Sequence, residues 1–265
     1  MELVRTAQQT PRLRVLASAG STNDVLAELN RSAPEPTLST VITLDQTGGR
    51  GRLGRVWTAP KDKTLAASVL VRPEHAAGSP GFPFGWIPLV AGAAMCSSID
   101  ALVGDGRTGL KWPNDVQVDG LKVCGVLAEL LPPGDAVVIG TGVNLTLTED
   151  ELPVPTATSL ALAGVAPRGD ELVDLVLSRY LVTLAELVER LANAGGDETA
   201  SGIHRVVSEW CRTIGRDVRV SLPSGDDLFG VASGIDATGR LLVRGSRGGE
   251  ITAVAAGDVT HLRYE

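Results

Sequence analysis

The segment DVQVDGLKVCGVLAELL, residues 115–131, contains two strand-like runs joined by Asp119-Gly120. An Asp-Gly pair between two such runs favours a two-residue β-hairpin, because both turn residues must adopt positive φ angles. The segment therefore predicts an antiparallel pair of strands at 116–118 and 121–131. Antiparallel pairing in the middle of the chain sets the expectation for the rest of the fold.

Apolar and β-branched runs on both sides extend this sheet. Strands are expected at 13–16, 39–44, 65–71 and 136–144, and helices at 84–103, 169–193 and near 202–212. Ser21 or Thr22 is placed to cap a further helix whose apolar face carries Val25, Leu26 and Leu29. The expected main domain is α+β, with a mixed, mainly antiparallel sheet flanked by helices.

The composition changes after Gly215 to short β runs separated by turn residues. The runs 217–222, 228–235, 241–243 and 250–254 are divided by Pro-Ser-Gly, Ala-Thr-Gly and Arg-Gly-Gly. This spacing is typical of a small β-barrel. We therefore expect a main domain at 1–214 and a small C-terminal β-barrel at 215–265.

Length and charge exclude several classes of protein. A chain of 265 residues can bury a sizeable core, and a net charge of −7 disfavours a general nucleic-acid binder. No run approaches the roughly 18 consecutive apolar residues of a membrane span, and the first residues lack a signal-peptide core. Cys96, Cys124 and Cys211 form no CxxC pair, which disfavours disulfide and zinc frameworks. We expect a cytoplasmic protein that binds neither DNA nor membranes.

A basic loop, Gly-Arg-Gly-Arg-Leu-Gly-Arg at 49–55, interrupts this acidic chain. Its glycines let backbone amides approach an anion, and its guanidinium groups donate several hydrogen bonds to phosphate or carboxylate. The spacing of Gly49, Gly51 and Gly54 also matches a dinucleotide fingerprint, but that motif must open a helix and here Val-Trp-Thr-Ala-Pro follows. A solvated turn is the ordinary alternative, so the other motifs of the chain have to decide between an anion-binding loop and a solvated turn.

With four other motifs this loop resembles the catalytic domain of biotin protein ligases. In chain order the motifs are Ser21-Thr22-Asn23, Gln46 with 49–55, Lys111-Trp112-Pro113-Asn114-Asp115, Lys122 with Gly125, and Gly140-Thr141-Gly142-Val143-Asn144. The resemblance spans about residues 13–265, and the C-terminal runs look like the SH3-like domain of that family. It implies the class II synthetase-like fold that biotin and lipoate ligases share.

The resemblance implies a two-step reaction. The biotin carboxylate attacks the α-phosphate of ATP to give biotinyl-5'-adenylate, and a lysine of a carrier protein then takes the acyl group. The implied cofactors are ATP and Mg²⁺, with biotin as substrate. The implied partner is a biotin carboxyl carrier protein domain of a biotin-dependent carboxylase.

The resemblance also implies roles for individual residues. Lys122 and Arg52 are the expected catalytic residues, because fixed cations offset the repulsion between a carboxylate and a triphosphate. Biotin is expected to bind at Ser21, Thr22, Asn23, Gln46, Arg50, Gly51, Arg52 and Lys122, with backbone groups of Gly51 and Lys122 serving its ureido ring. ATP and the adenylate are expected to bind at Arg50, Arg52, Arg55, Trp57, Lys111, Asn114, Asp115, Gly142 and Asn144. Asn114 and Asp115 are the expected Mg²⁺ contacts, through the phosphates.

Ordinary structural roles compete with these assignments. Ser21-Thr22-Asn23 suits a helix cap, Pro113-Asn114-Asp115 suits a turn that enters a strand, and Trp57 suits the core. Trp57 as a residue that stacks on adenine, and Asn144 as one that reads the nucleotide, therefore rest on the resemblance alone.

Three other functions stay open. A lipoate or octanoate ligase shares the fold but usually carries a histidine in its glycine/arginine motif. A biotin-binding regulator needs a DNA-binding module, for which the 20 residues before Ser21 are too few. A peptide-binding module that uses the barrel leaves the polar motifs unexplained. Pairing into a homodimer through an exposed sheet edge also stays open.

Overall fold

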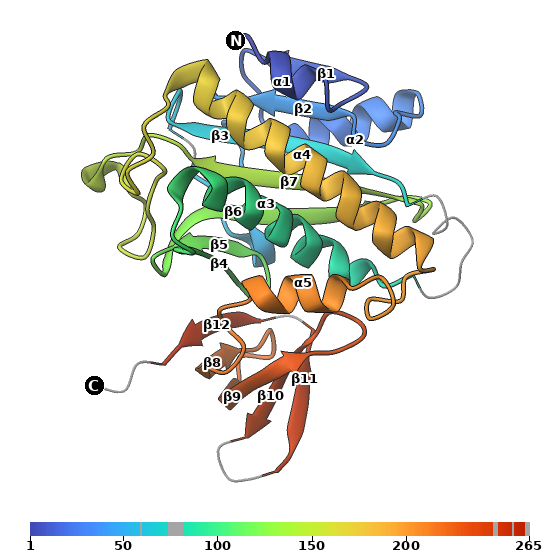
Figure 1. The fold of residues 1–265 in the computed structure, drawn as a ribbon, viewed down its shortest axis with the longest axis vertical. Helices are drawn as coiled ribbons and strands as arrows, with labels where there is room; N and C mark the ends of the chain where they lie inside the picture. The colour runs from blue at the N-terminus through green and yellow to red at the C-terminus, as the bar shows by residue number, and fades with distance from the viewer. Residues whose placement is uncertain (59, 74–81, 246–248, 256, 263–265) are drawn as a thin grey trace.

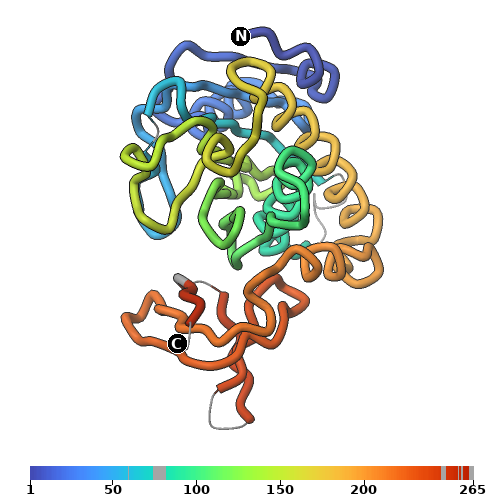
Figure 2. The backbone as a smooth tube through the Cα atoms, turned by 60° about the vertical axis from the view of Figure 1, so that its left-hand side comes forward, coloured from blue at the N-terminus to red at the C-terminus, as the bar shows by residue number. Residues whose placement is uncertain are grey.

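The computed structural model describes residues 1–58, 60–73, 82–245, 249–255 and 257–262 (Figure 1). These residues form a seven-stranded sheet with helices on both faces and a five-stranded antiparallel sheet made by the C-terminal part of the chain. The arrangement confirms the α+β class with a mainly antiparallel main sheet. The smaller sheet lies at one end of the main body (Figure 2).

The main sheet is antiparallel apart from one pair of strands. Its order is β1 (Leu13–Leu16), β2 (Thr40–Thr43), β3 (Thr64–Val71), β7 (Ala136–Asn144), β6 (Leu121–Leu131), β5 (Asp115–Val118) and β4 (Thr108–Lys111). Strands β1 and β2 are parallel. Asp119 and Gly120 join β5 to β6 with φ angles of 53° and 78°, as the predicted hairpin requires.

Helices cover the two faces of this sheet unequally. Helices α3 (Ile87–Val103), α4 (Gly169–Asn193) and α5 (Ile203–Trp210) lie on the near face in Figure 1, and the short α1 (Val4–Ala7) packs against α4. Helix α2 (Thr22–Ser32) packs on the opposite face, where its Leu26 belongs to the same buried cluster as Leu70 of β3. Because side chains alternate along a strand, Leu65, Ala67 and Val69 of β3 enter the α3/α4 core while Ser68 faces α2.

By length and composition the stretch 84–103 could cross a membrane, a criterion that buried core helices also meet. Here most of this stretch is buried. Residues such as Leu89, Val90 and Met95 belong to the main hydrophobic core between the sheet and α4. The structure thus uses this helix as a core element.

The smaller sheet has the strand order β11 (Ile251–Val254), β10 (Leu241–Gly245), β9 (Asp227–Ile235), β8 (Asp217–Ser221) and β12 (Asp258–His261). Four of these strands match the predicted runs, and β12 was not predicted. It pairs antiparallel with β8, although β9, β10 and β11 lie between the two strands in the sequence.

Two tryptophans tie the smaller sheet to the main body. Trp86, in the short helix η2 (Phe84–Trp86), donates from Nε1 to the carbonyl oxygen of Ala237 at 3.0 Å. Trp112 donates from Nε1 to the carbonyl oxygen of Gly239 at 3.1 Å. The β9–β10 turn is therefore held at the edge of the main sheet, next to the Lys111–Asp115 motif.

Candidate active site

A pocket opens on the α2 face of the main sheet, where α2 begins. All the predicted site residues except Asn144 line it, namely Ser21, Thr22, Asn23, Gln46, Arg50, Gly51, Arg52, Arg55, Trp57, Lys111, Asn114, Asp115, Lys122 and Gly142. Gly257 of the C-terminal region also lines it. The structure thus brings motifs that are scattered over more than 120 residues to one place.

Glycines on two central strands form the floor of this pocket. Gly125 of β6 is the cross-strand partner of Gly142 of β7, and Gly140 lies two residues before Gly142 on the same strand face. A Cβ atom on Gly140 would come within 2.4 Å of Oδ1 of Asn23, so only glycine lets α2 approach the strand this closely. The first glycine of the Gly-Thr-Gly motif is therefore required because a side chain there would collide with α2.

The indole of Trp57 lies on this glycine floor. A Cβ on Gly142 would meet Cε2 of Trp57 at 2.4 Å, and one on Gly125 would meet Cζ3 at 3.2 Å. Nε1 of Trp57 is buried and has no hydrogen-bond partner among the described residues. A buried indole N–H normally has a hydrogen-bond partner, so this donor is an exception at the floor of the pocket.

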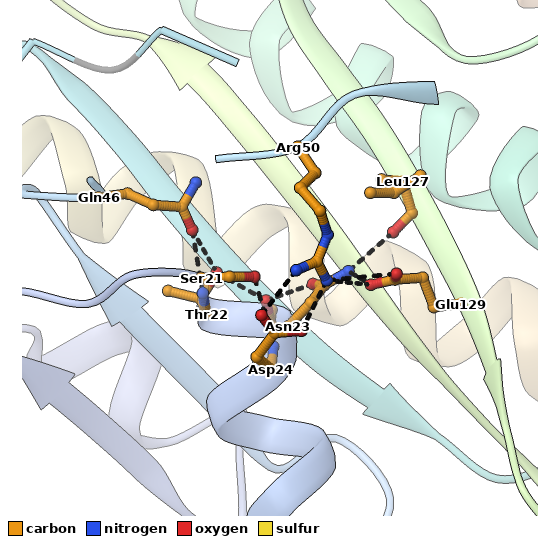
Figure 3. A network of polar contacts seen from close by, with 9 residues as sticks. Ser21, Thr22, Asn23, Asp24, Gln46, Arg50, Leu127 and Glu129 are labelled. Atoms are coloured by element: carbon orange, nitrogen blue, oxygen red, sulfur yellow. Dashed lines mark hydrogen bonds and ion pairs between the residues drawn. The ribbon is translucent and has the colours of Figure 1, made fainter. Parts of the chain in front are cut away.

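A polar network links the start of α2 to the sheet (Figure 3). The backbone N–H of Thr22 donates to Oε1 of Gln46 at 2.9 Å, and the hydroxyl of Ser68 lies 2.7 Å from Oγ1 of Thr22 and 2.6 Å from Oδ1 of Asn23. An amide oxygen only accepts, so Ser68 donates its single proton to Asn23 and accepts from Thr22. Ser21 is the N-cap, as predicted, and its Oγ accepts from the N–H of Asp24.

Arg50 forms ion pairs with two carboxylates at one side of the pocket. Its two terminal nitrogens lie 2.6 Å from Oδ2 and Oδ1 of Asp24, a bidentate pair, and one of them lies 3.3 Å from Oε1 of Glu129 (Figure 3). Hydrogen bonds from Arg50 lower the pKa of Asp24. Asp24 and Glu129 already compensate the charge of Arg50, so this arrangement does not support its predicted role in binding the anionic groups of biotin and ATP.

The glycine/arginine loop folds back on itself like a small hairpin. The N–H of Gly51 donates to the carbonyl oxygen of Arg55 at 2.7 Å, and the N–H of Trp57 donates to that of Gly49 at 3.0 Å. In this arrangement the N–H of Gly51 is bonded within the loop, and the expectation that backbone groups of Gly51 bind the ureido ring stays a prediction. The turn contains Leu53, an exposed residue with φ of 56° and ψ of 37°, followed by Gly54 with φ of 74°.

Lys122 lies at the centre of the pocket. Its Nζ is 2.6 Å from Oδ1 of Asp115 and 5.5 Å from the centre of the Trp57 ring. Its backbone N–H donates to Thr156 and its carbonyl oxygen accepts from the N–H of Thr158, both at 2.8 Å. The backbone groups of Lys122 are thus bonded to the 156–158 segment, and of the two only the carbonyl oxygen has capacity for a further hydrogen bond.

The two residues predicted to contact Mg²⁺ are adjacent and both lie in the pocket. Nδ2 of Asn114 donates to the carbonyl oxygen of Val126 at 2.6 Å, which leaves its Oδ1 available, and Asp115 shares its carboxylate with Lys122. No group of three or more His, Cys, Asp or Glu side chains suited to hold a metal occurs in the part of the chain that the structure describes.

Asn144 is buried beside the pocket rather than in its lining. Its Nδ2 donates to the carbonyl oxygen of Thr158 at 2.9 Å. This bond links the end of β7 to the same 156–158 segment that holds Lys122. Its predicted reading of the nucleotide has no support from this placement, and the observed contact is structural.

Three residues of the network were not singled out from the sequence. Ser68 lies in an apolar strand, Asp24 follows the Ser-Thr-Asn motif, and Glu129 lies near the end of β6. A signal for Ser68 was present in retrospect, since a polar residue within the strand run 65–71 is either exposed or hydrogen-bonded. Asp24 and Glu129 carry no comparable local signal.

Comparison with known proteins connects this geometry to one family. A model described as the biotin/lipoate A/B protein ligase family matches residues 15–144, and one described as the biotin protein ligase C terminal domain matches residues 213–262. The chain is 39% identical to the biotin–[acetyl-CoA-carboxylase] ligase of Mycobacterium tuberculosis, over 99% of this chain and 93% of that protein. It is 30% identical to a bifunctional ligase/repressor of Bacillus subtilis, over 88% of this chain and 69% of that protein.

Solved structures agree with the sequence matches. The biotin protein ligase from Aquifex aeolicus in complex with biotin and ATP superposes with a TM-score of 0.73 at 25% identity, over 96% of this chain and 100% of that chain. The biotin protein ligase from Leishmania major in complex with biotinyl-5-AMP gives a TM-score of 0.57 at 22% identity, over 93% of this chain and 99% of that chain. The second match bears on the fold alone.

Proposed function

The chain belongs to the biotin/lipoate A/B protein ligase family, and on this premise we propose that it activates biotin with ATP and attaches it to a lysine of a biotin carboxyl carrier protein. The observation that carries this function is the single pocket that joins Lys122, the glycine/arginine loop and the glycine floor. A relative that shares 39% identity over nearly the whole chain is named for this reaction. The same name favours biotin over lipoate or octanoate as the acyl group.

Lys122 is the proposed central cation. Its ammonium group is mobile enough to exchange Asp115 for a substrate anion, because the lysine stem is flexible and the pair is partly exposed. Charge that develops between the biotin carboxylate and the α-phosphate would be stabilised at this point. Arg52, which lines the same pocket, is the proposed second cation.

The start of α2 and Gln46 form the proposed biotin end of the site. The carbonyl oxygen of the Gln46 side chain accepts from the backbone N–H of Thr22, so the amide NH₂ of Gln46 is turned toward other partners (Figure 3). A neutral ureido ring needs oriented donors and acceptors of this kind. Trp57, which lies on the glycine floor of the same pocket, is proposed to stack on the adenine of ATP.

ATP is proposed to bind toward Lys111, Asn114 and Asp115, together with Arg55 and Gly142. Mg²⁺ fits this region only as a partner of the phosphates, because Asn114 and Asp115 alone supply too few oxygen ligands for an octahedral ion. The ion would neutralise phosphate charge, while the protein residues orient the nucleotide.

The remaining proposals concern organisation and partners. Residues 1–214 form the proposed catalytic domain and 215–265 the proposed SH3-like domain. Gly257 of the second region lines the pocket, so both proposed domains contribute to it. We further propose a cytoplasmic enzyme that works without binding DNA or a membrane. Homodimer formation through the β1 edge of the main sheet is the proposed mode of association if the protein pairs.

The test is biotin incorporation into a purified carrier domain with ATP and Mg²⁺. Lys122→Ala is expected to lower the rate about 100-fold or more, the size of losing one preorganised electrostatic contact. Lys61→Ala is the matched control, because Lys61 is an exposed lysine of the same region whose ammonium group lies 3.6 Å from Asp45. Transfer of lipoate but not biotin would contradict the proposal, and so would an unimpaired Lys122→Ala enzyme.

A further inference from the structure

Ser68 is a buried serine in the middle of β3, on the face that α2 covers. Its exposed fraction is 0%, and its neighbours Ala67 and Val69 belong to the apolar core on the other face. A buried hydroxyl costs free energy unless it is hydrogen-bonded. Ser68 has two partners, Oδ1 of Asn23 at 2.6 Å and Oγ1 of Thr22 at 2.7 Å. Both partners line the pocket, so Ser68 touches the site through them.

The partners of Asn23 determine which way its amide group faces. Nδ2 of Asn23 lies 2.5 Å from Oε2 of Glu129 and 3.4 Å from the carbonyl oxygen of Leu127. Carboxylate and carbonyl oxygens accept hydrogen bonds, so the NH₂ group belongs on this side and the amide oxygen faces Ser68. An amide oxygen also only accepts. The single proton of the Ser68 hydroxyl is therefore donated to Asn23.

This direction at Ser68 decides the direction of the Thr22 hydroxyl. Because Ser68 has no second proton, Thr22 is the donor in the 2.7 Å contact between the two hydroxyls. Oε1 of Gln46 lies 3.2 Å from Oγ1 of Thr22 but accepts from the backbone N–H of Thr22 instead, at 2.9 Å. With its proton committed to Ser68, Oγ1 of Thr22 offers only lone pairs to the pocket.

Gln46 presents the opposite polarity next to Thr22. Its Oε1 faces the backbone N–H of Thr22, so its Nε2 is a donor, and Gln46 also lines the pocket. The pocket wall thus carries an acceptor beside a donor. A cyclic urea carries an N–H group beside a carbonyl group and complements such a pair. A ring without N–H groups leaves the acceptor unpaired, which costs affinity.

We propose that Ser68 is a positioning residue that holds the Thr22 hydroxyl as a hydrogen-bond acceptor, and so makes the pocket selective for acids whose ring carries an N–H group. The proposal rests on the function proposed above, because the ureido ring of biotin is the group concerned. Without the Ser68 hydroxyl, the proton of Thr22 can turn to Oε1 of Gln46, and the lone pairs of Oγ1 turn with it. The ordinary alternative is that Ser68 only ties α2 to β3.

Calorimetric titration of the full chain with three acids separates the two roles. Ser68→Ala should raise the Kd for biotin about ten-fold, the size of one hydrogen bond between neutral groups. The Kd for desthiobiotin, which keeps the urea ring and lacks the sulfur ring, should rise by the same factor. The Kd for lipoate, whose ring has no N–H group, should not rise. No loss for biotin, or an equal loss for all three acids, overturns the proposal.

The kinetics of biotin transfer provide a second readout that a merely structural role would not produce. In Ser68→Ala the KM for biotin should rise about ten-fold, while kcat and the KM for ATP change less than about two-fold. Ser98→Ala is the matched control, because Ser98 of α3 is also a buried serine, 1% exposed, and donates to the carbonyl oxygen of Val176 at 2.7 Å. Its loss should leave the KM for biotin unchanged, and a rise equal to that of Ser68→Ala overturns the proposal.

Thr22→Val tests the route through which Ser68 acts. This change removes the acceptor at nearly constant shape and should also raise the Kd for biotin about ten-fold. Adding Ser68→Ala to Thr22→Val should then have no further effect, whereas additive effects overturn the proposal and transfer the role of Ser68 to Asn23. A wild-type chain that binds no biotin would contradict the proposed function as well, but wild-type binding that Ser68→Ala leaves unchanged contradicts only the role of Ser68.

Discussion

Trp57 and Gly142 lie so close together that a Cβ atom on Gly142 would come within 2.4 Å of Cε2 of the indole. Real Cβ atoms do not approach other heavy atoms so closely, and the neighbouring contact with Nε1, at 2.7 Å, is also too short. The glycine is therefore required by the position of Trp57 rather than by backbone conformation. Through this contact Gly142 determines how closely the indole of Trp57 lies to the sheet.

We predict that Gly142→Ala displaces Trp57 and raises the KM for ATP at least about ten-fold, because the added methyl group and the indole cannot occupy the same space. Steady-state kinetics and tryptophan fluorescence measure the two effects. Gly234→Ala is the control, since a Cβ at this strand glycine meets nothing within 4 Å. In a Trp57→Ala background the alanine at 142 should be almost harmless, and a full effect there would contradict this explanation.

A second prediction concerns the contact between the two sheets. Gly239 has φ of +85°, and a Cβ there would come within 2.8 Å of the carbonyl oxygen of Gly85. Gly239→Ala should therefore destabilise the protein by more than the roughly 1 kcal/mol that a left-handed alanine costs by itself. Gly225→Ala isolates that backbone cost, because Gly225 has φ of +93° and open space around it.

Urea unfolding of the two glycine variants measures the difference. The amount by which Gly239→Ala lowers the free energy of unfolding beyond Gly225→Ala measures the Gly85 contact together with the nearby hydrogen bond from Trp112 to Gly239. Activity should fall with it, since Trp112 and Gly257 both line the pocket. Equal stability of the two variants would show that the domain contact contributes nothing at this point.

Local patterns predicted most of the fold because they depend on neighbours in sequence. The hairpin at Asp119-Gly120, the helix cap at Ser21 and the long helix at 169–193 each follow from side-chain periodicity and turn chemistry. The parallel pairing of β1 with β2 and the pairing of β12 with β8 were not predictable in this way. Both depend on contacts between distant segments, and β12 is only four residues long.

The pocket was predicted better than the partners inside it. Residue types suited to anions and to a neutral ring were identified by resemblance, and the structure gathers them. The pairing of Arg50 with Asp24 and the use of the Gly51 and Lys122 backbone groups were missed. A motif shows which groups are available, whereas the geometry of the surrounding chain decides which of them are already bonded.

A third prediction concerns the thiols. Burial raises the pKa of Cys124 to about 12 despite the nearby Lys122, and burial also raises the pKa of Cys96 and Cys211. Because only the thiolate reacts, all three cysteines should resist a disulfide reagent at pH 8 in the native protein. The same reagent should titrate three thiols in guanidinium chloride. Rapid native labelling of Cys124 would show that the segment after Lys122 opens readily.

The last prediction concerns acid stability and Glu35, which is 3% exposed. Burial by itself would raise the pKa of Glu35, but hydrogen bonds from Arg14 and Ser39 and the charges of Arg14 and Arg12 outweigh it, and the pKa lies below its ordinary value of 4.5. A depressed pKa in the folded state means that ionised Glu35 stabilises the protein fully above about pH 4.5. This contribution is lost as the pH falls through the lower, folded-state pKa.

Glu35→Gln should accordingly lower the free energy of unfolding by about 1.5–3 kcal/mol at pH 7, the range for hydrogen bonds to a charged group. The gap between wild type and variant should shrink as the pH falls below about 4, because the wild-type carboxyl group then becomes neutral as well. Urea unfolding at pH 7 and at pH 3.5 measures both values. The exposed Glu28→Gln change should have little effect at either pH, and a gap for Glu35→Gln that stays constant with pH would show that shape rather than charge makes this residue stabilising.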